Sequence, residues 1–414
     1  MKKMKKQYLI TAILALSLAA AGCSAATAGT SSSDPSGSES ISSDMSYDES
    51  SSDTIELSDS DGKAEITEGG TYIITGSTSD GMITVSADKD EEVILVLRDV
   101  SISSSDSAPI FVSSADRLYI TLEGDNTLSN GGAFDTVDGE EIDSVIYCKT
   151  DLIIGGTGTL GITSPSGHAI VCKDNMTISG GTFDITSGED GINTNDSLTI
   201  SDGTFDITSG DDAVHTDGTL LIDSGTFNIS AAEGLEGTVV IINDGDITIS
   251  ASDDGINAAQ KSDELSPYVE INGGTIDITM GAGDTDGIDS NGDIIINGGV
   301  ISINGQSTCD YDGKAELNGG TLILNGEESD TIPNQFAGGE GFPGKFPGNG
   351  ELPEGFEPSS DGGFPGGDRP QGGELPEGDP PQGGHPQDGE LPEGFEPPEG
   401  DPPQGMPGGK RTQE

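Results

Sequence analysis

Short segments in which apolar and polar residues alternate recur at intervals of about 22 residues through the middle of the chain. Three of them align as residues 176–186, 198–208 and 220–230, and each contains Gly-Thr-Phe. Alternation with a period of two predicts β-strands whose Ile, Leu, Val and Phe side chains face inward. From about residue 145 onwards the repeat is strict, whereas the strands before it are less regularly spaced.

A repeat of this length predicts a stacked solenoid, because a propeller blade needs about 40 residues and a leucine-rich repeat has its own Leu/Asn consensus. Each unit holds three short strands: one around a Gly-Ile-Asn phrase, one before a glycine-containing corner and one after it. We therefore predict an all-β, single-stranded parallel β-helix over residues 54–326. Glycine at the corners permits the positive φ of a sharp bend.

The two ends of the chain differ from this core. Residues 24–53 are rich in Ser, Gly and acidic residues and are interpreted as a flexible tether. Residues 327–414 are acidic and rich in Pro and Gly, and they repeat Glu-Leu-Pro-Glu-Gly without apolar segments. We expect this tail to be disordered as well.

Residues 1–23 have the features of an export signal, with four early lysines followed by a short apolar stretch. The stretch ends in Ala20-Ala21-Gly22-Cys23, which resembles the lipobox of bacterial lipoproteins. The resemblance implies acylation of Cys23 and anchoring to the outer face of the bacterial cytoplasmic membrane, at the cell surface. An ordinary cleaved signal is the alternative.

Charge narrows the range of partners. The chain has 74 acidic and 16 basic residues, which gives a net charge of -58. A phosphate backbone needs Lys and Arg, so nucleic acid is excluded as a natural partner. The partners that the charge still permits are metal cations, cationic surfaces and polyanions bridged by a metal.

The cysteines give no disulfide framework, because Cys23 belongs to the signal and three others remain. Cys148 and Cys172 align in consecutive repeats, which indicates stacked core side chains. A disulfide between them is the alternative, and it requires the geometry of a bridged pair.

An acidic turn precedes the inward apolar residue of each repeat, as in Asp254-Gly255-Ile256. The acids that align are Asp190, Asp212, Glu233 and Asp254. Equivalent residues on consecutive turns of a β-helix lie about 4.8 Å apart, so these like charges repel. Calcium takes about six to eight oxygen ligands and would neutralise them, so we predict Ca²⁺ sites along this column.

Further ligands for calcium are expected next to the column. The candidates are Asn193, Asn257, Asp211 and Asp253. After a longer step along the chain, Asp284, Asp286 and Asp289 are expected to form a separate site. The alternative interpretation is that all these acids are solvated turn residues.

These motifs resemble a known family, the bacterial carbohydrate-binding domain-containing lipoproteins, which are related to family 9 pectate lyases. The segments that carry the resemblance are residues 69–76, 93–97, 253–257 and 286–292 and the repeated Asn-Gly-Gly pieces. The resemblance implies a right-handed β-helix, calcium bound by Asp, and binding of plant cell-wall polysaccharide such as polygalacturonate or cellulose. The Asp-Gly-Ile pattern matches at Asp190, Asp254 and Asp286, whereas Ala213-Val214 follows Asp212.

Three functions remain open: a monomeric polysaccharide-binding surface protein, a calcium-dependent polysaccharide lyase, and a calcium-stabilised adhesin. A lyase needs a base, and Lys261 is the best candidate because it lies in an extra loop after an acidic turn. His168 and His215 share the register of the acids, which makes them candidate contacts for a metal or ligand; ordinary turn residues are the alternative. The chain has no Trp to stack on crystalline cellulose, so an acidic glycan bridged by calcium fits better.

Overall fold

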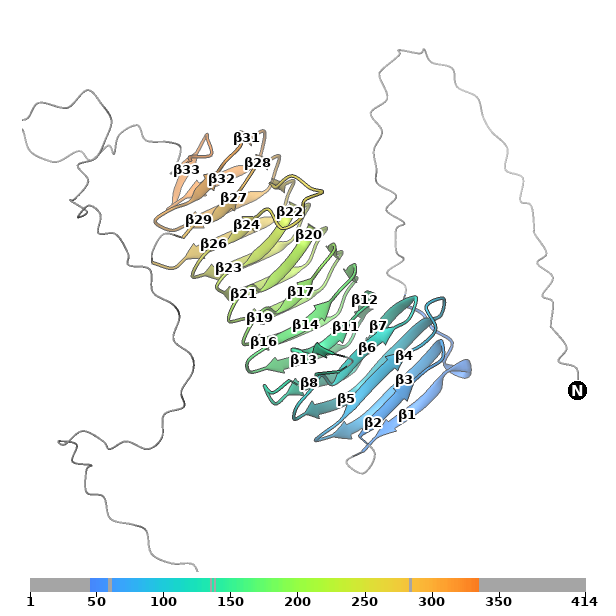
Figure 1. Cartoon of the computed structure of the whole chain (residues 1–414). Helices are drawn as coiled ribbons and strands as arrows, with labels where there is room; N and C mark the ends of the chain where they lie inside the picture. The colour runs from blue at the N-terminus through green and yellow to red at the C-terminus, as the bar shows by residue number, and fades with distance from the viewer. Residues whose placement is uncertain (1–44, 59–61, 135, 138, 283–284, 335–414) are drawn as a thin grey trace, which may run out of the picture. The chain divides into compact units, whose positions relative to one another are not determined.

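The computed structural model describes residues 45–58, 62–134, 136–137, 139–282 and 285–334. Its strands form a parallel solenoid of about 11 turns, consistent with a right-handed parallel β-helix (Figure 1). The all-β prediction and the three strands per turn are confirmed. The predicted signal, Cys23 and most of both predicted tails lie outside the described residues.

The strands stack into three parallel sheets, and some long strands bend around a corner and belong to two of them. Sheet I contains β2 (Lys63–Ile66), β4 (Met82–Ser86), β6 (Ile110–Ser114), β11 (Ser144–Cys148), β14 (His168–Cys172), β17 (Ile192–Thr194), β20 (Val214–Ile222), β22 (Leu235–Ile242), β24 (Ile256–Ala258), β27 (Ile288–Ser290) and β30 (Cys309–Tyr311).

Sheet II shares β20 and β22 with sheet I. Its other strands are β1 (Asp53–Leu57), β3 (Gly70–Thr78), β5 (Glu92–Ser104), β7 (Arg117–Glu123), β12 (Asp151–Gly156), β15 (Met176–Ile178), β18 (Leu198–Ile200), β25 (Tyr268–Ile271), β28 (Asp293–Ile296) and β31 (Ala315–Leu317).

Sheet III shares β3 and β5 with sheet II. Its other strands are β8 (Asp125–Asn130), β13 (Thr159–Ser164), β16 (Thr182–Ser187), β19 (Thr204–Thr208), β21 (Thr226–Ala231), β23 (Asp246–Ala251), β26 (Thr275–Met280), β29 (Val300–Asn304), β32 (Thr321–Leu324) and the antiparallel β33 (Glu327–Ser329). A short hairpin of β9 (Thr136–Val137) and β10 (Glu140–Glu141) precedes β11.

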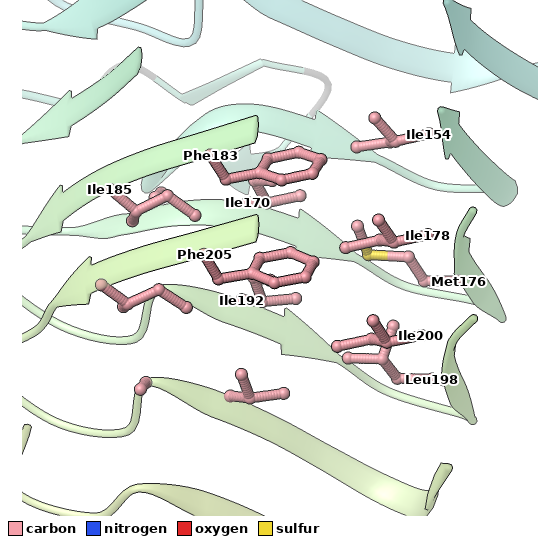
Figure 2. Close-up of a cluster of buried hydrophobic side chains, with 14 of the residues drawn as sticks. Ile154, Ile170, Met176, Ile178, Phe183, Ile185, Ile192, Leu198, Ile200 and Phe205 are labelled. Atoms are coloured by element: carbon pink, nitrogen blue, oxygen red, sulfur yellow. The ribbon is translucent and has the colours of Figure 1, made fainter. Parts of the chain in front are cut away.

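The core is a set of vertical ladders, because each inward residue lies above its equivalent in the next turn. Phe183 and Phe205 stack with ring centroids 4.8 Å apart, and Phe205 and Phe227 with centroids 4.6 Å apart. Figure 2 shows Ile170 above Ile192 beside this stack. The strict alternation of sheet III predicted these inward positions correctly.

Cys148 and Cys172 are register partners on β11 and β14, and both are buried free thiols. The prediction of stacked core cysteines is therefore confirmed. Cys309 is also buried and free.

Both ends of the described core extend beyond the predicted limits. Tyr47, in the predicted tether, donates a hydrogen bond to Glu123 and accepts one from Arg98, each of 2.7 Å. A 3-10 turn, η1 (Glu49–Ser51), follows it. At the other end Ile332 is buried against the core. In the described residues no helix has the length and apolar character needed to cross a membrane.

Candidate functional site

The predicted acids form one column along the edge of sheet I. Backbone hydrogen bonds fix the register: the amide that follows each acid donates to the carbonyl of the acid on the next turn. The N–O distance is 2.9 Å from Gly191 to Asp212, from Gly234 to Asp254 and from Gly255 to Asp286. We call Asp190, Asp212, Glu233, Asp254 and Asp286 the acid column.

Asp286 belongs to this column rather than to the separate group that the longer sequence step indicated. The extra residues, 259–267, leave the solenoid between β24 and β25 and rejoin it in register. Figure 1 shows this insertion in yellow beside β22. The amide of Asp286 donates to a carboxylate oxygen of Asp254 at 3.0 Å, as expected for neighbours in one ladder.

The glycine after most of these acids allows consecutive turns to approach closely. A Cβ on Gly191 would lie 2.6 Å from the carbonyl oxygen of Ala213, and one on Gly255 would lie 2.5 Å from that of Gly287. Neither glycine has a positive φ. The positive φ expected at corners occurs instead at sites such as Gly203. The Asp-Gly-Ile phrase therefore reflects packing between turns.

A second row of side chains stands three residues after the first on each turn. Strand register aligns its members, which are Asn193, His215, Glu236, Asn257, Asp289 and Asp310. Sequence reasoning missed Glu236 and Asp310 as site residues. The constant spacing of three residues after an aligned position was the signal that could have identified them.

In the first half of the column, carboxylates contact histidines. His168 lies 2.9 Å from Glu189 and 3.2 Å from Asp190. His215 Nδ1 lies 2.8 Å from Asp212 and 2.5 Å from Glu236. Burial lowers the pKa of His215, but hydrogen bonds to these two carboxylates outweigh burial and raise the pKa to about 10. His215, which is half-buried, is therefore a cation at neutral pH.

Lys261 supplies a second cation, from the insertion. Its Nζ lies 2.8 Å from Glu236 Oε1. Burial lowers the pKa of Lys261, but the contact with Glu236 and the charge of Glu233 outweigh it, so the pKa is raised above its ordinary value. A protonated ammonium cannot accept a proton. The geometry therefore makes Lys261 a charge partner of Glu236 and argues against its role as a catalytic base.

Beside the second half of the column, the second row contains a buried amide with an unsatisfied oxygen. Asn257 is only 8% exposed. Its Nδ2 donates to Glu233 at 2.9 Å and to Glu236 at 3.4 Å. These acceptors fix the orientation of the amide, and Oδ1 has no hydrogen-bond partner. An orphaned buried carbonyl-type oxygen is costly unless a donor or a cation meets it.

Carboxylates near Asn257 are hard to ionise. Burial, followed by the charges of Asp289 and Glu233, raises the pKa of Asp254 to about 7. Burial and the charge of Asp310 raise the pKa of Asp289 to about 6. Among the described residues, no ion pair joins Asp254 or Asp289 to a basic side chain. A divalent cation would supply the missing positive charge.

The remaining predicted ligands have different positions. Asn193 lies in the second row and donates to Asp190 at 2.6 Å. Asp211 and Asp253 are exposed and lie one residue before the column. Asp284 lies outside the described residues.

The structure thus defines a class: a parallel β-helix with a ladder of buried and half-buried carboxylates on one edge. Residues 60–238 and 211–333 match the family of carbohydrate-binding domain-containing proteins. These segments together span more than half of the chain, and the chain belongs to this family.

A curated relative is a carbohydrate-binding domain-containing protein of Acetivibrio thermocellus, 32% identical over 133 residues. The match spans 31% of this chain and 46% of the relative, so the chain covers about half of that protein's length. Among solved structures, the polysaccharide lyase-like protein from C. thermocellum, a gadolinium derivative, is 26% identical. That match covers 66% of this chain and 96% of the other, with a TM-score of 0.36.

Proposed function

We propose that this protein binds polysaccharide at the cell surface, and that Ca²⁺ held by the acid column bridges it to the carboxylates of an acidic glycan such as polygalacturonate. Membership of a carbohydrate-binding family supports the general class of ligand. The single observation that supports the metal is the orphaned Oδ1 of Asn257 among Glu233, Asp254 and Asp289.

The donor set fits calcium. Carboxylate and amide oxygens are hard ligands, and Ca²⁺ tolerates irregular geometry with several of them. Asn257 Oδ1, Asp254 and Asp289 would hold the ion, with Glu233 nearby. Bound calcium supplies positive charge on an otherwise acidic surface, where sugar carboxylates complete its coordination.

Without such a cation the chain would repel an acidic glycan, because its net charge is -58. Stacking on a crystalline neutral glycan is poorly supported as well. The chain has no Trp, and Phe183, Phe205 and Phe227 are each about 1% exposed. Few aromatic rings are therefore available to stack against a flat sugar surface.

The location is part of the proposal. We propose export and acylation at Cys23, with the anchored monomer on the outer face of the bacterial cytoplasmic membrane. Metabolic labelling with a radioactive fatty acid tests this: the protein should be labelled, and a Cys23→Ser variant should not. An equally labelled variant would contradict the anchor.

Calorimetric titration with polygalacturonate tests the calcium bridge. We expect binding in calcium and loss of binding in EGTA. Asp254→Asn should weaken glycan binding in calcium at least about tenfold, because it removes one charged ligand. Asp277→Asn is the matched control, since Asp277 is exposed on sheet III and should change little. Equal binding with and without EGTA would refute the bridge.

A further inference from the structure

A polar groove lies beside the insertion, and none of the residues assigned to calcium lines it. It has a volume of about 530 Å³, within the range of small-ligand sites. Its floor comes from three consecutive turns at the corner between sheets I and II. Its wall comes from the insertion, residues 259–267, and includes Leu265.

The floor presents a regular row of hydrogen-bonding side chains. Asn175, Ser197 and Thr219 occupy equivalent positions, because the residues that follow them are register partners on β15, β18 and β20. Such a row repeats about every 4.8 Å along the solenoid. Asp196 and Asp217 also line the groove and add strong acceptors.

The wall contributes one apolar side chain, Leu265. Leu265 is 36% exposed, and in the described part of the chain only Val300 is another large apolar side chain as exposed. The insertion that carries Leu265 is anchored. Backbone amides of Lys261 and Ser262 donate to Thr238 Oγ1 at 3.1 and 2.9 Å. The side chain of Gln260 donates to the carbonyl of Leu265 at 2.9 Å.

This combination matches a pyranose unit, which offers hydroxyl groups around its edge and C–H groups on its faces. Carboxylates accept strong hydrogen bonds from hydroxyls. The same carboxylates disfavour an anionic sugar. Asp196, Asp217 and Glu264 line the groove together with one ammonium, Lys261, whose charge is already paired with Glu236.

We infer that this groove is a direct-contact subsite for an uncharged pyranose unit, with Leu265 against the ring face and the floor residues on the hydroxyls. The inference rests on the proposed polysaccharide-binding function, but the subsite needs no metal. The protein would thus contact glycan in two ways: through bridged carboxylates at the acid column and through neutral sugar in the groove.

Titration of the full chain with cellohexaose, xylohexaose and mannohexaose in EGTA tests the inference. We expect at least one to bind, with affinity unchanged when calcium is added. Leu265→Asp should weaken this binding about tenfold or more. Val300→Asp is the matched control, since it makes the same change at the other exposed apolar residue and should have no effect. Circular dichroism melting shows whether each variant is folded.

Absence of binding by all three probes in EGTA would overturn the inference, as would equal affinities of Leu265→Asp and the unmodified protein. Equal weakening by Val300→Asp would also overturn it. If polygalacturonate binds in a calcium-dependent way but no neutral oligosaccharide binds, the calcium bridge is supported and the groove inference is overturned. If a neutral oligosaccharide binds but calcium has no effect on the binding of polygalacturonate, the calcium bridge is refuted and the groove inference is supported.

Discussion

At the level of single residues, the acid column divides between Glu233 and Asp254 according to how its charge is balanced. Before this position the chain supplies its own cations, since His215 and Lys261 both contact Glu236. After it, Asp254 and Asp289 keep raised pKa values and have no basic partner among the described residues. Under the proposed function, a bound cation balances the charge of the second half, whereas side chains do so in the first.

Removal of Lys261 should convert part of the first half into a cation site. In Lys261→Met, Glu236 loses its ammonium partner beside Glu233 and Asn257. We expect about one additional bound Ca²⁺, or a clear gain in affinity, because carboxylate oxygens become available. Equilibrium dialysis with calcium measures this. Lys89→Met, at an exposed turn, is the control; unchanged or reduced calcium binding by Lys261→Met would contradict the prediction.

At the level of elements, sheet III illustrates how the repeat stabilises the solenoid. On β16, β19 and β21 every second residue is buried, and the buried phenylalanines stack directly on one another. Phe205 thus contacts an equivalent ring in both neighbouring turns, whereas Phe183 and Phe227 each contact one. Stability in such a fold is approximately a sum of contacts between adjacent turns.

Phe205 is the central ring, so its removal disrupts two stacks. Phe205→Ala should lower the free energy of unfolding by about 3–5 kcal/mol, as expected for a large cavity in a packed core. Urea denaturation of the calcium-saturated protein measures this. The exposed neighbour provides the comparison, since Thr204→Ala should change stability by less than about 0.5 kcal/mol. Similar losses for both variants would contradict the role of the stack.

At the level of the whole molecule, calcium and pH should act together on stability. Burial raises the pKa values of Glu233 and Asp254 to about 7 in the folded chain. The folded state therefore holds protons that the unfolded state has released. Their stabilising contribution is fully present below the ordinary carboxyl pKa and is lost as the pH rises through about 7.

We expect the melting temperature of the calcium-free protein to fall between about pH 5 and pH 8 because of these groups. Saturating calcium should reverse the loss, by about 2.7 kcal/mol when free calcium is one hundred times its Kd. Differential scanning calorimetry with and without EGTA measures both effects. Magnesium should stabilise less, because it requires tighter octahedral geometry. A calcium-free melting temperature that rises over this interval would contradict the expectation.

Sequence periodicity was sufficient for the all-β solenoid, the inward ladders, the stacked cysteines and the register of Asp190, Asp212, Glu233 and Asp254. These features follow from local alternation and a constant repeat length, and both can be read from a single sequence. The spacing also contained the second row, although Glu236 and Asp310 were overlooked. The limits of the solenoid at its two ends were less clear from the sequence. Tyr47 and Ile332 pack against the solenoid by contacting residues that are distant in sequence.

Only the tertiary structure placed Asp286 in the acid column, Lys261 on Glu236 and Leu265 beside a groove. All three depend on the path of residues 259–267, an insertion that interrupts the repeat. Periodicity specifies which residues stack, because every turn has the same rise. It says nothing of where an irregular loop returns, because contacts between that loop and distant turns fix its path.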